Sequence, residues 1–425
     1  MGKKASFYTL GCKLNYAETS AIERQFVNSG WEVAGQFQKA DVYVINTCSV
    51  TEHSDKKGRN IIRRVHRINP DAIIAVTGCY AQLKPEEVGG LEGVDIVLGA
   101  DGKDRVLQSV LEIEAQRKAA NEAGEKKIIE VIPIKEVKNV IPAYSSGERT
   151  RSFLKVQDGC NYHCAYCTIP NARGDSRNIP IAKAVEEARE IAAKGIKEIV
   201  LTGVNIGDFG RTDGASFADL LKALNEVEGI ERYRISSIEP NLLTDEIVEW
   251  IASGTKFMPH FHIPLQSGSD EILRRVGRRY NTRMFREKIE LIRRNIEHVF
   301  IGIDVIVGLP GETDELFAET YNFLEDLRPA FIHIFPYSRR ANTRAAVMPD
   351  QVPDHVKTER VARLEELCDR LHSEFVAANS GRKEEVLFES TVKGGKMYGY
   401  TRNYIRVERP YDKTKIGRIV PVELD

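Results

Sequence analysis

The chain has 425 residues, of which 42% are hydrophobic and 29% are charged, and its formal net charge is −1. A chain of this length is too long for one ordinary core, so we expect two or three domains. It has no uninterrupted apolar run long enough to cross a membrane, which argues against a membrane partner. The N-terminal stretch MGKKASFYTLGCKL does not resemble a secretory signal, so we expect a cytoplasmic protein.

Strand-like and helix-like segments alternate over residues 1–115. The predicted strands are residues 6–10, 42–46, 73–77 and 95–98. This alternation predicts a doubly wound parallel α/β domain. Residues 116–150 mix charged residues with proline and glycine, which predicts a linker with room for one edge strand.

A second alternating series occupies the first part of a domain that we place at residues 151–380. The predicted strands are residues 152–157, 198–202, 233–237, 261–264, 301–307 and 331–335. Six βα units predict a partial, open (βα)6 version of the eight-unit barrel, and one helix over 355–379 follows them. Residues 381–425 contain short strand-like segments with glycine turns, which predict a small antiparallel β-barrel that is basic and rich in tyrosine.

The stretch GCNYHCAYC places Cys160, Cys164 and Cys167 in a C-x3-C-x2-C pattern. Three thiolates this close cannot complete a tetrahedral zinc site without a distant fourth ligand. They can hold three irons of a [4Fe–4S] cluster and leave the fourth iron open. The pattern follows the first strand of the barrel-like series, at the end where such folds place their chemistry. The alternative is a zinc site or three incidental cysteines.

Three further cysteines each follow a predicted strand of the first domain: Cys12, Cys48 and Cys79. Carboxyl ends of parallel strands meet at one edge of a doubly wound sheet, where ligands bind. We therefore expect a second three-thiolate cluster site there, the alternative being three buried structural thiols. The seventh cysteine, Cys368, lies on the apolar face of the predicted helix over 355–379, and we interpret it as a core residue.

Together with both cysteine sets, the stretches GCKLNYAE, VINTCSVT, TGCYAQ, IPNARGDSRN, HIPLQSGSD and VGLPGET resemble the radical S-adenosylmethionine (SAM) methylthiotransferase family over nearly the whole chain. The resemblance implies two [4Fe–4S] clusters and SAM as cofactors, held by the six cysteines named above. It also implies that SAM methylates a sulfur held at the first-domain cluster, and that a second SAM at the C-x3-C-x2-C cluster supplies a radical. Residues 381–425 resemble the TRAM RNA-binding module.

The resemblance also implies a SAM pocket at the strand ends of the barrel. Tyr166 is expected to pack beside the adenine of SAM. The other residues implied are Thr202, Gly203, Asn205, Ser237, Glu239, Gln266 and Ser267. For each of these, an ordinary strand-end turn is the alternative.

Within the family, the chain looks most like the enzymes that convert N6-threonylcarbamoyladenosine at position 37 of tRNA to its 2-methylthio derivative. The dipeptide Glu239–Pro240 stands where relatives acting on isopentenyladenosine have His-Pro. The implied partners are the tRNA anticodon stem-loop, an external electron donor and a sulfur donor. Isopentenyladenosine-37 and a ribosomal-protein aspartate remain alternative substrates, and a non-catalytic iron–sulfur carrier or scaffold is the alternative from a different class.

Two polar features have less specific interpretations. The stretch LRRVGRRY, which contains Arg274, Arg275, Arg278 and Arg279, predicts either an extension of an RNA-binding surface or a solvated helix face. We interpret His163, His260, His262 and His333 as structural histidines rather than ligands.

Overall fold

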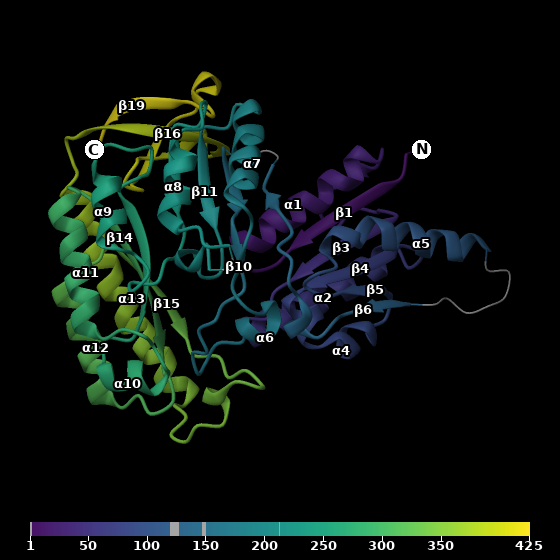
Figure 1. Cartoon of the computed structure of the whole chain (residues 1–425), viewed down its shortest axis with the longest axis horizontal. Helices are drawn as coiled ribbons and strands as arrows, with labels where there is room; N and C mark the ends of the chain where they lie inside the picture. Colours follow the sequence, from purple (N-terminus) through teal and green to yellow (C-terminus); the bar gives the residue numbers. More distant parts are fainter. Residues whose placement is uncertain (1, 120–126, 147–149, 212) are drawn as a thin grey trace. The chain divides into compact units, whose positions relative to one another are not determined.

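The computed structural model describes residues 2–119, 127–146, 150–211 and 213–425 (Figure 1). The chain divides into two compact units, each described here by itself. The N-terminal unit consists of Met1–Gly147, Phe153–Tyr162 and Cys167–Ile179, and the C-terminal unit of Glu148–Ser152, His163–Tyr166 and Pro180–Asp425. Within the described ranges, no helix combines the length and the apolar character needed to span a bilayer.

The N-terminal unit is built on a six-stranded sheet in which every neighbouring pair is parallel. The strands, in spatial order, are β2 (Glu32–Val33), β1 (Lys4–Thr9), β3 (Val42–Thr47), β4 (Ile73–Gly78), β5 (Val94–Leu98) and β6 (Ile128–Glu130). The predicted parallel sheet is confirmed, and β6 is the edge strand for which the segment 116–150 had room. Residues 120–126 and 147–149 of that segment lie outside the described residues.

Helices cover both faces of this sheet, as a doubly wound domain requires (Figure 1). The helices in this part of the chain are α1 (Lys13–Asn28), α2 (Glu52–Ile68), α3 (Cys79–Leu83), α4 (Pro85–Gly89) and α5 (Val106–Ala119), with two short 3-10 helices, η1 (Lys103–Arg105) and η2 (Ile134–Glu136). Ile62 and Val65 of α2 pack with Ile74 and Val76 on one face. Residues of α1 and α5, among them Phe26, pack against the other face.

The rest of the N-terminal unit precedes and follows the C-x3-C-x2-C motif in the sequence. Its elements are β7 (Ala143–Tyr144), β8 (Arg151–Lys155), β9 (Gln157–Asp158), α6 (Ile169–Arg173) and β10 (Arg177–Asn178). β7 is antiparallel to β8, and β9 is antiparallel to β10. The cysteine motif therefore occupies the loop between β9 and α6.

In the C-terminal unit, β11 and β12 form one parallel pair, and β13, β14 and β15 form a three-stranded parallel sheet. These strands are β11 (Glu198–Thr202), β12 (Arg232–Ile235), β13 (His260–Gln266), β14 (Phe300–Val307) and β15 (Phe331–Pro336). Together with β8, they are the six strands that the sequence predicts for the partial barrel. Their helical connections are α7 (Ile181–Ala193), η3 (Ile206–Asp208), α8 (Phe217–Asn225), α9 (Asp245–Ala252), α10 (Asp270–Arg275), α11 (Thr282–Asn295), α12 (Asp314–Leu327) and η4 (Arg344–Ala346).

One long helix, α13 (Asp354–Ala377), follows β15 and packs against it. Leu364, Cys368 and Leu371 are buried, as the apolar face of the predicted helix requires. The Cys368 sulfur accepts the backbone N–H of Ile332 on β15 at 3.2 Å. Its interpretation as a core residue is confirmed.

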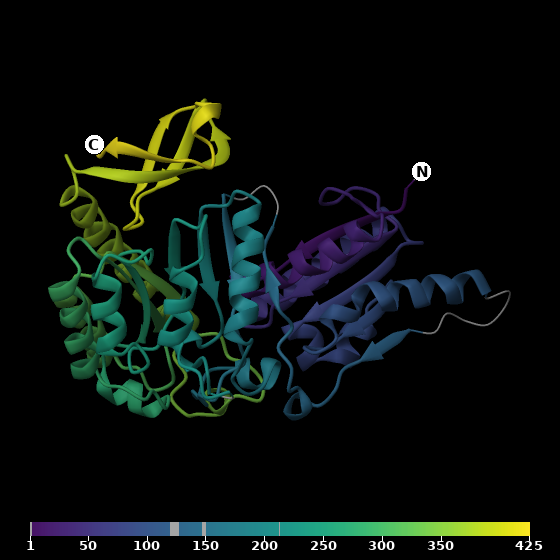
Figure 2. The same cartoon turned by 45° about the horizontal axis from the view of Figure 1, so that its top comes forward.

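The chain ends in a four-stranded antiparallel sheet, drawn in yellow in Figure 2. Its elements are β16 (Lys383–Lys393), β17 (Lys396–Tyr400), β18 (Arg406–Pro410), η5 (Lys413–Lys415) and β19 (Ile419–Glu423), with the strand order β18-β17-β16-β19. Val386, Phe388 and Met397 form its core. Arg232 of β12, whose side chain is 1% exposed, donates to the backbone carbonyls of Glu385 and Tyr400, which ties this sheet to the rest of the C-terminal unit.

Candidate active site

The three strand-end cysteines of the N-terminal unit lie at one edge of its sheet. Cys12 is the N-cap of α1 after β1, Cys48 directly follows β3, and Cys79 directly follows β4. Because β1, β3 and β4 are neighbours, the carboxyl ends of these strands lie side by side. Gly11 has φ +91°, and a Cβ there would lie 2.7 Å from the Cys48 sulfur, so only glycine lets the loop before Cys12 approach that closely.

The three thiols are also close enough to influence one another electrostatically. Burial raises the pKa of Cys48 to about 11, with smaller increases from the Cys79 and Cys12 thiols. Burial likewise raises the pKa of Cys79, while the positive charges of Arg173 and Lys103 act in the opposite direction. A ligand that needs thiolates must therefore displace protons from these sulfurs when it binds.

A set of three thiolates suits an iron–sulfur cluster better than a single zinc ion, which takes four ligands. A zinc ion with bonds of about 2.3 Å brings its sulfur ligands to about 3.8 Å from one another. A four-iron cluster spreads its thiolates over the corners of a larger cube, and three thiolates leave one iron open.

A buried network of five charged side chains lies beside these cysteines within the N-terminal unit. It consists of Glu18, Lys103, Lys155, Asp158 and Arg173, and none of the five side chains is more than 6% exposed. Glu18 binds Lys103 at 2.5 Å, Lys155 at 2.8 Å and Arg173 at 3.1 Å. Asp158 binds Lys155 at 2.8 Å and Arg173 at 2.9 Å. Three cations thus face two carboxylates, and a fourth, Arg177, lies 3.8 Å from Asp158.

The network joins the two cysteine-bearing regions of the N-terminal unit. Arg173, at the end of α6, donates to Asn15 Oδ1 at 2.5 Å on α1, just after Cys12. Despite their burial, Glu18 and Asp158 have pKa values below the usual range because the surrounding cations favour the carboxylates. The pKa of Lys103 is lowered, chiefly by burial. Sequence reasoning missed this network, although a lysine in the buried strand FLKV was a signal for it.

The C-x3-C-x2-C motif begins in a tightly folded loop. The Cys160 N–H donates to the Gly174 carbonyl at 2.9 Å, and the Cys160 sulfur accepts the Tyr162 N–H at 3.3 Å. Gly159 has φ +73°, and a Cβ there would lie 2.0 Å from the Asp175 carbonyl oxygen, so this close approach requires glycine. Both backbone features fix the direction in which the chain enters the motif.

The middle of the motif, in the C-terminal unit, lies against a buried arginine. Arg278, whose side chain is 3% exposed, donates to the Cys164 sulfur at 3.2 Å and to the Tyr166 hydroxyl at 3.3 Å, and it pairs with Glu239. Burial raises the pKa of Glu239, and the charge of Arg278 acts in the opposite direction. Neither interpretation of LRRVGRRY holds for Arg278, because its guanidinium points into the fold. Arg274 and Arg279 are exposed.

The other residues predicted for a SAM pocket follow the carboxyl ends of β11, β12 and β13. Thr202, Asn205 and Ser267 are buried, whereas Gly203, Ser237, Glu239 and Gln266 are partly exposed. Gln266 has φ +69° at a register shift after Pro264, an unfavourable backbone conformation for a non-glycine residue. The Ser267 hydroxyl lies 3.1 Å from Thr320 Oγ1 and accepts the Ser269 N–H, so it holds the loop after β13 in place. Their role at SAM stays a prediction.

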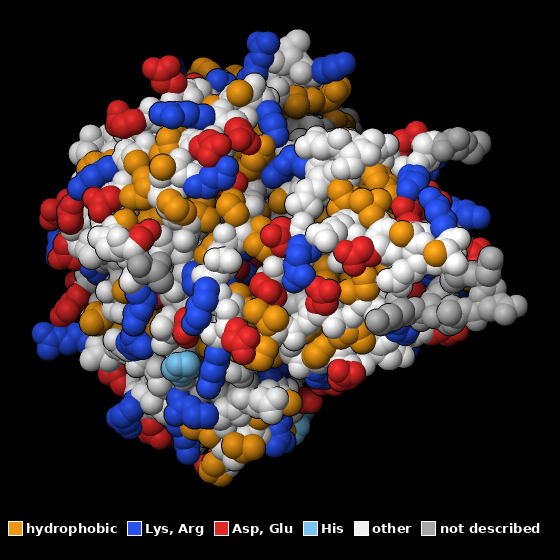
Figure 3. Space-filling model, turned by 45° about the vertical axis from the view of Figure 1, so that its right-hand side comes forward, with side chains coloured by type: hydrophobic (Ala, Val, Ile, Leu, Met, Phe, Trp, Pro, Cys, Tyr) orange, Lys and Arg blue, Asp and Glu red, His pale blue; other side chains and the backbone are white. Residues whose placement is uncertain are grey.

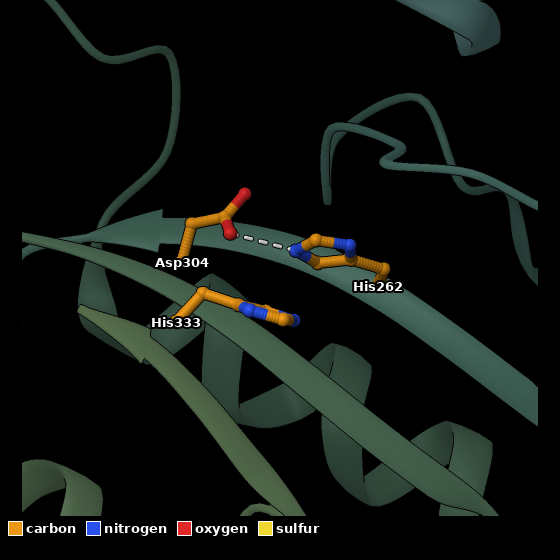
Figure 4. A group of neighbouring side chains, drawn as sticks. All are labelled: His262, Asp304 and His333. Atoms are coloured by element: carbon orange, nitrogen blue, oxygen red, sulfur yellow. Dashed lines mark hydrogen bonds and ion pairs between the residues drawn. The ribbon is translucent and has the colours of Figure 1, made fainter. Parts of the chain in front are cut away.

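A group of three polar side chains lies on the neighbouring strands β13, β14 and β15 (Figure 4). His262 Nε2 lies 2.7 Å from Asp304 Oδ1, and the rings of His262 and His333 are 4.7 Å apart between centroids. Sequence reasoning treated the two histidines separately as structural residues. The pairing of adjacent strands, which brings the three side chains together, was not visible in the sequence.

Charged side chains of both signs are interspersed on the face drawn in Figure 3, in line with the net charge of −1. The C-terminal segment departs from this balance, since residues 381–425 contain ten Lys and Arg against seven Asp and Glu. Arg406 stacks on the Tyr398 ring at 4.1 Å, and Tyr411 is exposed. Basic and aromatic side chains of this kind suit phosphate pairing and base stacking.

Comparison with known families finds two matches. Residues 154–324 match the radical SAM superfamily, and residues 4–99 match an uncharacterized protein family, UPF0004. The first match spans β11 to β14 and the cysteine motif, and the second covers the strand-end cysteines.

Several curated relatives are similar over nearly the full chain. A "Threonylcarbamoyladenosine tRNA methylthiotransferase MtaB" of Bacillus subtilis is 41% identical over 99% of this chain and 93% of the relative. A protein of the same name from Aquifex aeolicus is 39% identical over 99% of both. A "tRNA-2-methylthio-N(6)-dimethylallyladenosine synthase" of Thermoanaerobacter pseudethanolicus is 33% identical over 98% of this chain and 89% of the relative.

Among solved structures, the radical S-adenosylmethionine methyltransferase TsrM of Kitasatospora setae aligns with a TM-score of 0.58. The alignment covers 82% of this chain and 74% of that protein, at 15% sequence identity. This likeness is one of fold alone.

Proposed function

Since the chain belongs to the radical-SAM family of tRNA methylthiotransferases, we propose that it adds a methylthio group to C2 of N6-threonylcarbamoyladenosine at position 37 of tRNA. Two relatives named for the threonylcarbamoyl substrate are 41% and 39% identical, against 33% for one named for the dimethylallyl substrate. The observation that carries the proposal is the combination of these identities with two separate sets of three cysteines in the chain.

Each cysteine set fits a [4Fe–4S] cluster with one open iron. Cys12, Cys48 and Cys79 would hold one cluster, and Cys160, Cys164 and Cys167 the other. C2 of adenine bears an unactivated hydrogen that no side-chain acid or base removes, and the clusters and SAM, when bound, supply the radical and sulfur chemistry that this step needs.

The chain's own residues position and shield this chemistry. Cys48, Cys79 and Cys164 are buried, so water has little access to their sulfurs. Arg278 bonds the Cys164 sulfur, Tyr166 and Glu239 together, which supports Tyr166 and Glu239 as part of the SAM pocket. The proposed remainder of that pocket is Thr202, Gly203, Asn205, Ser237, Gln266 and Ser267.

We assign the parts of the proposed reaction to the domains expected from the sequence. In this proposal residues 1–115 hold the sulfur-carrying cluster, residues 116–150 connect the domains, residues 151–380 carry the SAM chemistry, and residues 381–425 bind the anticodon stem-loop. The excess of basic side chains and the exposed Tyr411 in the last segment support an RNA contact. The reaction also requires an external electron donor and a sulfur donor, and we place it in the cytoplasm, with its tRNA substrate.

The reaction can be tested directly with the full chain. The protein is reconstituted anaerobically with iron and sulfide, then incubated with SAM, dithionite and an anticodon stem-loop containing N6-threonylcarbamoyladenosine. Nucleosides from the digested RNA are separated and weighed by mass spectrometry. We expect a product heavier by one methylthio group in place of one hydrogen, together with 5′-deoxyadenosine.

Two control reactions make the result specific. The same reaction with a stem-loop containing isopentenyladenosine is expected to give much less product. A reaction with Cys160→Ala protein is expected to give neither 5′-deoxyadenosine nor product. Product from the isopentenyl RNA alone would refute the proposed substrate, and absence of 5′-deoxyadenosine from the reconstituted wild-type protein would refute the enzyme class.

A further inference from the structure

His262, Asp304 and His333 form one cluster because their strands are adjacent and parallel. Asp304 on β14 is directly opposite His333 on β15, and His262 on β13 reaches Asp304 at 2.7 Å. Ligand-type atoms of all three side chains lie within 4.8 Å of one another (Figure 4). We call these three residues the His–Asp–His group.

The three side chains of the group are partly exposed, on the opposite face of their strands from buried isoleucines. Ile263, Ile303 and Ile332, which alternate with these residues along the strands, are buried. The Ile332 backbone contacts Cys368 of α13, so α13 packs along this part of the sheet. The side chains of His262 and Asp304 are 19% and 18% exposed, which leaves them accessible to a bound molecule.

A line of polar side chains connects the group to the cysteine motif within the C-terminal unit. Asp304 lies close enough to Glu239 for its negative charge to raise the pKa of that carboxyl group. Glu239 in turn pairs with Arg278, which donates to the Cys164 sulfur. The backbone N–H of Ile238 donates to the His262 carbonyl at 3.0 Å, so the loop that carries Glu239 lies beside the strand that carries His262.

We propose that the His–Asp–His group binds the N6 substituent of the substrate adenosine and selects a polar substituent over an apolar one. This inference rests on the proposed function, because it assigns the part of the site that reads the base modification. A threonylcarbamoyl substituent carries N–H donors, a carbonyl, a hydroxyl and a carboxylate. Asp304 is suited to accept from the N–H groups, and imidazole N–H groups are suited to donate to the oxygens.

The selectivity has a physical cause in the desolvation of the three side chains. An isopentenyl substituent would cover the partly exposed side chains of His262 and Asp304 and offer them no hydrogen bond in return. A site whose buried polar groups are left unpaired by the wrong ligand rejects that ligand strongly, whereas a purely apolar pocket discriminates weakly. The group thus favours the threonylcarbamoyl substrate both by bonding it and by excluding the apolar alternative.

The test compares kcat/KM for two stem-loop RNAs, one with N6-threonylcarbamoyladenosine and one with isopentenyladenosine, in the reconstituted full-length enzyme. His333→Phe keeps an aromatic ring against His262 and removes the polar atoms, and Asp304→Asn keeps the size and removes the charge. His355→Phe makes the same exchange at an exposed position of α13 and serves as the matched control. Iron content and circular dichroism show whether each variant folds and assembles its clusters.

We expect His333→Phe and Asp304→Asn each to lower kcat/KM for the threonylcarbamoyl RNA by about 10- to 100-fold, with no matching loss for the isopentenyl RNA. The control is expected to keep the wild-type ratio. Folded variants that keep the wild-type ratio would overturn the inference while leaving the proposed function intact. A wild-type enzyme that modifies only the isopentenyl RNA would instead overturn the proposed function.

The same residues are also a possible ligand set for a divalent metal ion, so metal content forms a second arm of the test. We expect wild-type protein, incubated with zinc and dialysed, to retain no more zinc than His333→Phe. One equivalent of zinc per chain that is lost in His333→Phe would assign the group to a metal ion and overturn the inference.

Discussion

The buried charge network of the N-terminal unit makes a quantitative prediction about stability. Arg173 donates to Glu18, Asp158 and Asn15, and all of these bonds are lost in Arg173→Met. Breaking a buried ion pair costs about 3–5 kcal/mol. In this variant each carboxylate keeps a lysine partner, and Asp158 also keeps Arg177 at 3.8 Å. We therefore expect the free energy of unfolding to fall by an amount near the lower end of this range, about 3 kcal/mol.

Glu18→Gln should be more harmful than Arg173→Met. It leaves four cations, Lys103, Lys155, Arg173 and Arg177, with Asp158 as the remaining carboxylate, and Lys103 loses its partner at 2.5 Å. We therefore expect Glu18→Gln to lower the free energy of unfolding by an amount near the upper end of the range, about 5 kcal/mol. Since a folded domain is stable by only about 5–15 kcal/mol, both losses are large enough to measure.

The assay is urea unfolding of the cluster-free protein under reducing conditions. The chain has two tryptophans, of which Trp31 is buried in the N-terminal unit and Trp250 belongs to the C-terminal unit. In a Trp250→Phe background, tryptophan fluorescence therefore reports the N-terminal unit alone. Arg63→Met, at an exposed position of α2, is the control. The reasoning is refuted if either variant lowers the free energy of unfolding no more than Arg63→Met does. It is also refuted if Arg173→Met lowers this free energy more than Glu18→Gln does.

Further outcomes follow from the same contacts. Because the pKa of Asp158 in the folded chain lies below its usual range, its contribution to stability is present above about pH 4 and fades as the pH falls. In Asp158→Asn, the free energy of unfolding should therefore fall less between about pH 4 and lower pH than in the wild type. The same decrease in both proteins would contradict this expectation. In Cys79→Ala we expect iron to fall from about eight to about four per chain, with 5′-deoxyadenosine still formed but no methylthio product; product at the wild-type level would exclude a sulfur role for that cluster. Arg278→Gln leaves Glu239 without its ion-pair partner and should lower the stability of the C-terminal unit by about 3 kcal/mol, measured by urea unfolding with Arg283→Gln as the exposed control. Lys413→Ala should reduce the slope of log affinity for the stem-loop against log salt by about one, and an unchanged slope would remove this lysine from the RNA surface.

Most of the fold was predictable because it depends on local patterns. Apolar runs at regular spacing identified the parallel strands of both series, and parallel strands place their ends at one edge of a sheet. The convergence of Cys12, Cys48 and Cys79 followed from this rule alone. Element boundaries were less accurate, since β13 runs from His260 to Gln266 rather than over 261–264.

The parts that sequence reasoning missed depend on partners that are distant in the chain. Arg173 and Glu18 are 155 positions apart, and a local window cannot show that one lies against the other. Arg278 was grouped with neighbouring arginines because a run of basic residues usually faces solvent. His262, Asp304 and His333 come from three strands, and only the strand order and register bring them together.

The central claim is tested most directly by the nucleosides of cellular tRNA. The chain is expressed in a bacterial strain that makes N6-threonylcarbamoyladenosine but lacks its 2-methylthio derivative, and the digested tRNA is analysed by mass spectrometry. We predict that 2-methylthio-N6-threonylcarbamoyladenosine is formed with the wild-type chain and absent with Cys79→Ala. Formation of only the isopentenyl counterpart, or of no methylthio nucleoside from a chain with both clusters assembled, would contradict the account.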